Sequence, residues 1–96
     1  MHIILLRFTD SRTSAERFMN DHKAWIKRGF DDGVFLLVGS VEPDVGGGIF
    51  AHNITHENLL RRVAEDPFVR EGIVSAEVVE ISPARVDRRL EFLAGA

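Results

Sequence analysis

The sequence predicts a small α+β domain, and three observations lead to this class. A chain of 96 residues has room for one hydrophobic core only. Four short apolar runs have the length and branched side chains of strands, and two longer segments repeat apolar residues at the spacing of an amphipathic helix. Their order is β-α-β-β-α-β, which is that of the ferredoxin-like fold. We therefore expect a four-stranded antiparallel sheet with two helices on one face.

The first strand and the first helix are expected in the N-terminal third of the chain. The run Ile3–Leu6 is apolar and ends in a polar turn. Thr13 or Ser14 is placed to cap the helix, with Glu16 as the second half of a capping box. The helix is expected to end near Gly29. Its inward face follows i, i+3, i+4 spacing and consists of Ala15, Phe18, Met19, His22, Trp25 and Ile26.

The middle of the chain predicts a hairpin and a second helix. Val34–Val38 and Ile49–His52 are apolar runs that form the second and third strands. The segment Glu42–Gly48 between them is expected to be a flexible, glycine-rich loop. The second helix ends at Asp66, because a residue that precedes a proline avoids the helical region.

The last quarter of the chain holds the fourth strand and a tail. Val74–Ile81 forms the strand, and Pro83 ends it. We expect residues 1–83 to form the domain and residues 84–96 to form a C-terminal extension. A weak helical period predicts a short helix in the extension, packed on its own sheet edge or on a partner. The period consists of Val86, Leu90 and Leu93.

The second strand also predicts the state of assembly. An antiparallel strand with one wet face alternates between apolar and polar residues, but Val34–Val38 is apolar throughout. Both of its faces are therefore expected to be covered. Helices cover one face, and a second subunit is the expected cover of the other. The sequence thus predicts a homodimer formed through sheet faces.

The composition narrows the function and the compartment. The net charge is -3 with both signs interspersed, which argues against a nucleic-acid surface. The chain has no cysteine, so disulfide and thiolate chemistry are excluded. The apolar start is too short for a signal peptide, and no run approaches the ~20 residues of a membrane span. We expect a cytoplasmic protein that binds neither nucleic acid nor membranes.

Two polar residues occupy positions on the apolar stripes of the helices. His22 has apolar residues of the inward face one turn before it and one turn after it. Asp66 shares the face of Leu59 and Val63 on the second helix. A buried carboxylate needs a partner, and a histidine is a natural one. We therefore expect His22 and Asp66 to meet in a hollow under the sheet.

Such a pair suits acid/base chemistry on a small molecule. Histidine ordinarily titrates near ~6.5, so it gains or loses a proton at physiological pH. A carboxylate bonded to one ring nitrogen orients the ring and leaves the other nitrogen as a positioned general base. Each residue also has a purely structural alternative. His22 could bind a backbone carbonyl in the core, and Asp66 could cap the turn at Phe68–Arg70.

The remaining candidates indicate neither a metal nor a cofactor. Gly46–Gly48 lacks the lysine and Ser/Thr of a phosphate loop, and it is expected to be a mobile hairpin loop or a lid. If a cavity lies beside His22, the aromatic side chains placed to line it are those of Trp25 and Phe68. The other histidines have no metal-ligand spacing with a partner: His2, His52 and His56.

Several elements of the chain together carry a family resemblance. They are His22–Ile26, Gly33, Gly39, the glycine-rich loop and Asp66–Gly72. Over most of the chain these elements resemble the YciI-like (YCII-related) proteins. The resemblance implies a dimeric α+β barrel, in which ferredoxin-like domains pair through their sheet faces. It also implies that the paired histidine and aspartate lie in a pocket between helices and sheet.

The resemblance also implies a class of function. Related barrels include isomerases, lyases and monooxygenases that act on small, often aromatic, metabolites. Many YciI-like members have Gly-Pro where this chain has Gly39-Ser40, so the Ser40 hydroxyl is placed to change the polarity of the pocket. We expect a small cofactor-independent enzyme of the isomerase or lyase type. The alternative is a non-catalytic small-molecule-binding or regulatory module, since the sequence has no second acid, oxyanion-hole motif or cofactor fingerprint.

Overall fold

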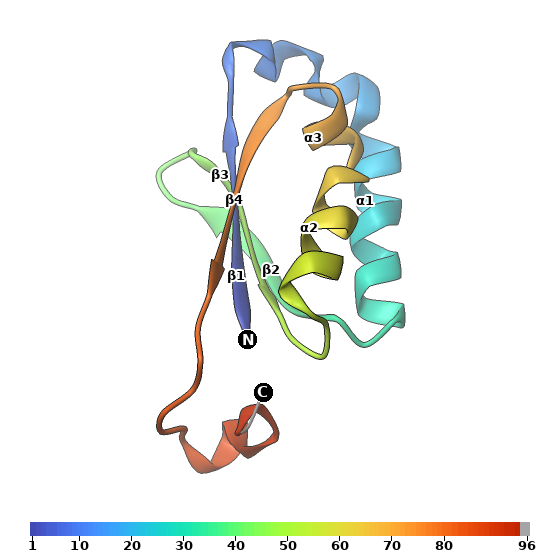
Figure 1. Ribbon diagram of the computed structural model, residues 1–96. Helices are drawn as coiled ribbons and strands as arrows, with labels where there is room; N and C mark the ends of the chain where they lie inside the picture. The colour runs from blue at the N-terminus through green and yellow to red at the C-terminus, as the bar shows by residue number, and fades with distance from the viewer. Residues whose placement is uncertain (95–96) are drawn as a thin grey trace.

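Within residues 1–94, which the computed structural model describes, four antiparallel strands form one sheet (Figure 1). Their order across the sheet is β2-β3-β1-β4. The predicted α+β class and the ferredoxin-like topology are confirmed. The strands are β1 (His2–Phe8), β2 (Phe35–Val41), β3 (Gly46–Ala51) and β4 (Val74–Glu80).

The α-helices lie on one face of the sheet (Figure 1). None of the helices in the described part of the chain is long and apolar enough to cross a membrane. They are α1 (Ala15–Asp31), α2 (His56–Ala64) and α3 (Pro67–Arg70). Two 3-10 helices flank this arrangement in sequence, η1 (Asp10–Ser14) before α1 and η2 (Arg88–Leu93) after β4.

The entry to α1 differs from the prediction. Thr9 caps η1, and its hydroxyl oxygen accepts a hydrogen bond from the Ser11 N–H at 3.1 Å. Thr13 lies inside η1, and Ser14 makes no side-chain cap bond. The predicted capping box is therefore wrong. Because η1 runs directly into α1, the unsatisfied N–H groups lie one turn earlier than the helical period of the sequence suggests.

The glycine-rich segment is strand rather than a mobile loop, which corrects a second expectation. Gly46–Gly48 pairs with β1 on one side and with β2 on the other. Only a short turn, residues 42–45, separates β2 from β3. Glycine weakens a strand in isolation. Here β1 and β2 form hydrogen bonds with the backbone of the glycines from both sides. The local sequence does not show that these two strands are neighbours.

The core fills the space between the sheet and the helices. Ile4 and Leu6 of β1 point toward the helices and are buried, whereas Ile3 and Leu5, which alternate with them, are only partly buried. Trp25 of α1 is 2% exposed, and its indole N–H donates to the Arg62 carbonyl oxygen at 3.0 Å. The helical stripes predicted from the sequence thus supply this core. Its other members include Phe35, Ile49, Leu59, Val63, Phe68 and Ile73.

The C-terminal extension packs against its own chain. The predicted short helix is present as η2, a 3-10 helix with a kink at Leu90. Leu93 is buried, and the ring of Phe92 lies edge-on to the ring of His52 with centroids 5.6 Å apart. The extension therefore adds an apolar contact beside the end of β3.

Candidate functional site

A cavity of about 410 Å³ lies where β1, β2 and β3 meet the α1 and α3 helices. Its apolar wall comes from the strands and the two helices, and its polar wall comes from the β2–β3 hairpin. Glycine residues of the hairpin lie at its surface, so the absence of side chains there leaves space. The apolar lining includes Leu6, Phe8, Met19, Phe68 and Val74, and the polar lining includes His22, Ser40, Glu42 and Asp44.

His22 and Asp66 meet beside this cavity. His22 Nδ1 lies 2.7 Å from Asp66 Oδ1, which is the distance of a strong, charge-assisted hydrogen bond. The side chain of Asp66 is fully buried, and that of His22 is 13% exposed. The two stripes of the sequence therefore converge, although the residues lie 44 positions apart.

Asp66 also performs the structural role that the sequence left open. It is the N-cap of α3, and its Oδ1 accepts the Phe68 N–H at 3.1 Å. The α2 helix ends at Ala64, so Asp66 precedes a new helix instead of ending the second one. The predicted end of the second helix at Asp66 is therefore wrong, and the free N–H groups at the start of α3 favour the carboxylate as an N-cap. One oxygen thus holds both the turn and the imidazole.

The ring of His22 is also positioned by stacking on a neighbouring aromatic ring. It stacks on Phe68 with centroids 4.0 Å apart and planes 4° apart. A carboxylate accepts only, so the bond to Asp66 requires a proton on Nδ1. A neutral His22 then has its lone pair on Nε2. The arrangement therefore provides an oriented imidazole at the wall of a cavity, with one nitrogen free to accept a proton.

The predicted lining residues divide into two groups. Gly39, Ser40 and Phe68 line the cavity, so the Ser40 hydroxyl is available to a ligand. Trp25 does not line it, which corrects that expectation. Its indole is turned into the core, where it packs edge-on to Phe35 with centroids 5.1 Å apart. Helical spacing predicts that Trp25 lies on the inward face of α1. It does not predict whether a residue on that face packs in the core or lines a cavity.

Sequence reasoning missed the charged rim of the cavity. Glu42 and Asp44 lie on its wall, and the Arg12 guanidinium donates to Asp44 Oδ1 at 2.5 Å. This bond from Arg12 lowers the pKa of the Asp44 carboxyl below its ordinary value, so Asp44 is ionised near neutral pH. The ion pair links η1 to the hairpin turn. No local pattern signals it, because the partners are 32 residues apart.

A second cluster of ionisable side chains was also missed. His2, His56 and Glu80 come from β1, α2 and β4, and each offers a ligand atom within 4.8 Å of those of the other two. The spacing of these histidines along the chain does not indicate a metal site, because the cluster depends on strand pairing. His2 and Glu80 are direct partners in the β1–β4 ladder.

Comparison with known proteins supports the fold. No family model matches the chain, and no curated protein matches it. A solved structure is similar: 5-chloro-2-hydroxyhydroquinone dehydrochlorinase (TftG) from Burkholderia phenoliruptrix AC1100, in complex with 2,5-dihydroxybenzoquinone. The TM-score is 0.67 at 14% sequence identity, and the match covers 84% of this chain and 93% of that chain. The chain therefore shares its fold with an enzyme whose structure holds a small hydroxyquinone.

Proposed function

We propose that the protein is a small, cofactor-independent enzyme that uses His22 and Asp66 for acid/base chemistry. The observation that carries this proposal is the 2.7 Å contact between His22 Nδ1 and the fully buried Asp66 at the wall of a cavity. Membership of the YciI-like family is part of the proposal. It is supported by the fold and by the residues that resemble that family.

The chemistry follows from the tautomer that the pair sets. Nε2 of His22 takes a proton from a C–H next to a carbonyl, and the electron pair of that bond forms an enolate. Asp66 stabilises the imidazolium that results. Return of the proton to a different carbon gives an isomerisation. Departure of a leaving group with its electron pair from the next carbon gives an elimination instead, and the proton is released to water.

A small hydroxylated ring compound is the substrate class that the cavity suits best. Most of its lining is apolar, and the lining includes the aromatic rings of Phe8 and Phe68, while Ser40 offers a hydroxyl. The similar solved structure is that of a dehydrochlorinase, which its name assigns to a chlorinated hydroxyhydroquinone. Elimination from such a ring is within the scope of a single general base.

The proposal is tested by proton exchange in D2O. Wild-type protein is incubated with a panel of small hydroxyquinones that starts with 2,5-dihydroxybenzoquinone, and loss of ring C–H signals is followed by NMR. We expect exchange above the buffer rate, and we expect it to persist after dialysis against a chelator. Saturable binding without exchange would favour the non-catalytic binding module. If no compound of the panel binds and none shows exchange, the proposed substrate class is contradicted.

We also propose that two chains pair through the open face of the sheet. An apolar row crosses all four strands on that face, because Leu37 is opposite Phe50, and Ile3 is opposite both Phe50 and Val79. Leu37 is 49% exposed, Phe50 40% and Val79 37%. Burial of apolar surface contributes about 25 cal/mol per Å², so a contiguous row favours association.

Phe50→Glu is expected to convert the protein from dimer to monomer, since it places a charge at the centre of the row. Size-exclusion chromatography with light scattering at micromolar concentration measures the mass. The matched control is Leu60→Glu on α2, where the residue is 46% exposed and lies outside the row. This control is expected to remain a dimer. A monomeric wild type, or a dimeric Phe50→Glu variant, would refute the proposed interface.

A further inference from the structure

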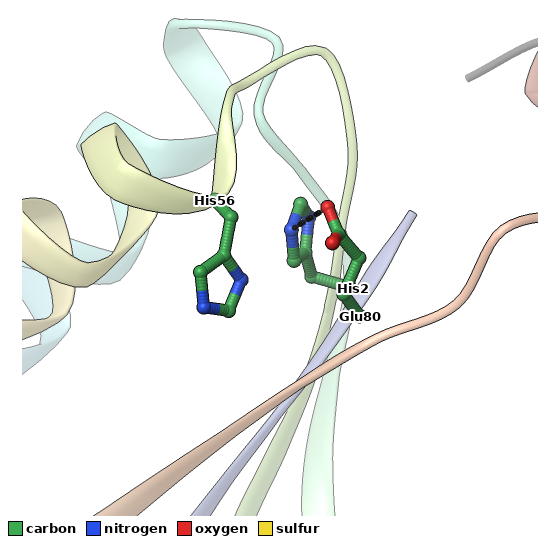
Figure 2. A group of neighbouring side chains, drawn as sticks. All are labelled: His2, His56 and Glu80. Carbon is green, nitrogen blue, oxygen red and sulfur yellow. Dashed lines mark ion pairs between the residues drawn. The ribbon is translucent and has the colours of Figure 1, made fainter.

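A second cavity, of about 540 Å³, lies at the opposite end of β1 from the His22 site. It shares no lining residue with the first cavity. Its walls come from the ends of β1 and β4, from the segment before α2, and from Phe92 of η2. His2 and Glu80 lie in this wall, and His56 stands beside them in the first turn of α2 (Figure 2).

His2 has a hydrogen-bonding capacity that the described chain does not satisfy. Its side chain is 4% exposed, and neither ring nitrogen has a hydrogen-bond partner within residues 1–94. Nε2 lies 3.2 Å from Glu80 Oε2, which is an ion-pair contact. Nδ1 of His56 is also buried without a partner in the described structure. Buried polar atoms without partners are rare in proteins, and one explanation is an ion that completes the site.

We propose that His2, His56 and Glu80 bind a divalent transition metal ion, with Zn²⁺ as the ion that fits the ligands. Two imidazoles and one carboxylate form a common zinc ligand set. Each residue contributes one ligand atom, and these atoms lie within 4.8 Å of one another. Figure 2 shows the three side chains as neighbours, contributed by one helix and two neighbouring strands.

Binding an ion requires the three ligand atoms, which lie within 4.8 Å of one another, to approach the separation found between zinc ligands. Donors at about 2.0–2.1 Å from zinc in tetrahedral geometry lie roughly 3.3 Å from one another. His2 Nε2 and Glu80 Oε2, at 3.2 Å, already have this separation. The rings of His2 and His56 are stacked, with centroids 5.4 Å apart and planes 30° apart, so the His56 ring must rotate to direct a nitrogen at the ion. His56 and Glu80 are less buried than His2, so their side chains have room to adjust.

The pKa of His2 reflects its burial and its charged neighbours. Burial lowers the pKa of this imidazole below its ordinary value, and Glu80 opposes the shift. The amino terminus, which donates to the Ile81 carbonyl oxygen, and His56 add to the lowering. Three protein ligands leave a fourth position of tetrahedral Zn²⁺ open to water or to a ligand in the cavity.

The test is titration of ZnCl2 into untagged, chelator-treated full chain, followed by calorimetry. We expect one Zn²⁺ per chain, a rise in Tm with added Zn²⁺, and movement of the His2 and His56 ring signals in NMR spectra. His56→Asn and Glu80→Gln are expected to weaken binding by about 10- to 100-fold or more, since even outer partners of a metal ligand have effects of that size. These variants spare the buried His2, so the fold is retained.

The matched controls are two other histidine variants. His52→Asn changes a histidine of the same cavity that is outside the cluster, and His22→Asn changes the histidine of the other cavity. Both are expected to bind Zn²⁺ as the wild type does. Absence of saturable 1:1 binding would overturn the proposal. Binding that survives both His56→Asn and Glu80→Gln would also overturn it, because the ion would then be held elsewhere.

Discussion

Replacing His22 by glutamine is expected to lower kcat/KM for ring-proton exchange by about 10²- to 10⁴-fold, the usual contribution of a positioned general base. Glutamine has a similar reach and retains hydrogen-bonding groups, but it does not accept a proton near neutral pH. The change removes the proton acceptor from the wall of the cavity and leaves the rest of the wall in place. Exchange rates are measured by NMR in D2O, and ligand affinity is measured separately. The two measurements distinguish loss of proton transfer from loss of ligand binding.

Asp66→Asn is the companion variant and probes positioning rather than proton transfer. Asparagine keeps the shape of the side chain and an oxygen that can accept the Phe68 N–H. It removes the negative charge beside Nδ1, which stabilises the imidazolium during turnover. We expect kcat to fall by about 10²-fold or more. Ligand affinity should change little, because Asp66 is not part of the cavity wall.

A spectroscopic readout separates this role from a merely structural one. The ¹⁵N shifts of the two ring nitrogens of His22 report which of them carries the proton. Wild-type protein is expected to show the Nδ1–H tautomer, as the bond to Asp66 requires. Loss of activity in an Asp66→Asn protein that is partly unfolded would not support the proposal, because unfolding alone abolishes activity. A folded Asp66→Asn variant with wild-type exchange would contradict it.

The contact between these two residues could be predicted because it rests on helical periodicity. Each residue breaks an apolar stripe, and an inward polar group must find a partner. The depth of each residue along its stripe could not be predicted in the same way. Trp25 shares the face of His22, yet it packs in the core while His22 reaches the cavity. Depth depends on the neighbouring elements, which spacing within one helix does not describe.

The second strand illustrates a different limit. Its continuous apolar run predicts two covered faces, but the register of β2 against β3 also shifts between Phe35 and Leu37. Such an irregularity inserts a residue and breaks the alternation of the strand by itself. Val34, at the start of the run, precedes β2 and donates its N–H to the Gly29 carbonyl oxygen. The sequence pattern therefore had more than one cause, and the apolar row across the sheet is the stronger basis for a dimer.

The glycines of β3 form a strand although their composition predicts a loop. A run of three glycines between two strands is typical of a flexible loop. In the structure all three glycines lie within the sheet, and two of them, Gly46 and Gly47, line the cavity. Gly46 must be glycine because the backbone of β1 lies where a Cβ would be. This requirement is visible only once the pairing of β1 with β3 is known.

Gly46→Ala is expected to destabilise the protein by about 3 kcal/mol or more. A Cβ at this position would lie 1.8 Å from the Leu6 carbonyl oxygen and 3.1 Å from the Arg7 Cα, both of which belong to the backbone of β1. The φ angle of Gly46 is +155°, which L side chains rarely adopt. Strain of this kind costs on the order of 1–3 kcal/mol, and overpacking against a rigid neighbour adds about 1–3 kcal/mol.

The measurement is the urea midpoint and the Tm at one fixed protein concentration, because association would make both depend on concentration. For a chain of this size, about 3 kcal/mol corresponds to a fall in Tm of roughly 12–24 °C. Gly47→Ala is the matched control one residue away, where the nearest atom to a new Cβ is the Gly39 carbonyl oxygen at 3.7 Å. That variant is expected to remain within about 1 kcal/mol of the wild type, because alanine restricts the unfolded chain and meets only ordinary contacts. Equal midpoints for the two variants would show that β1 and β3 do not approach each other as closely as this register requires.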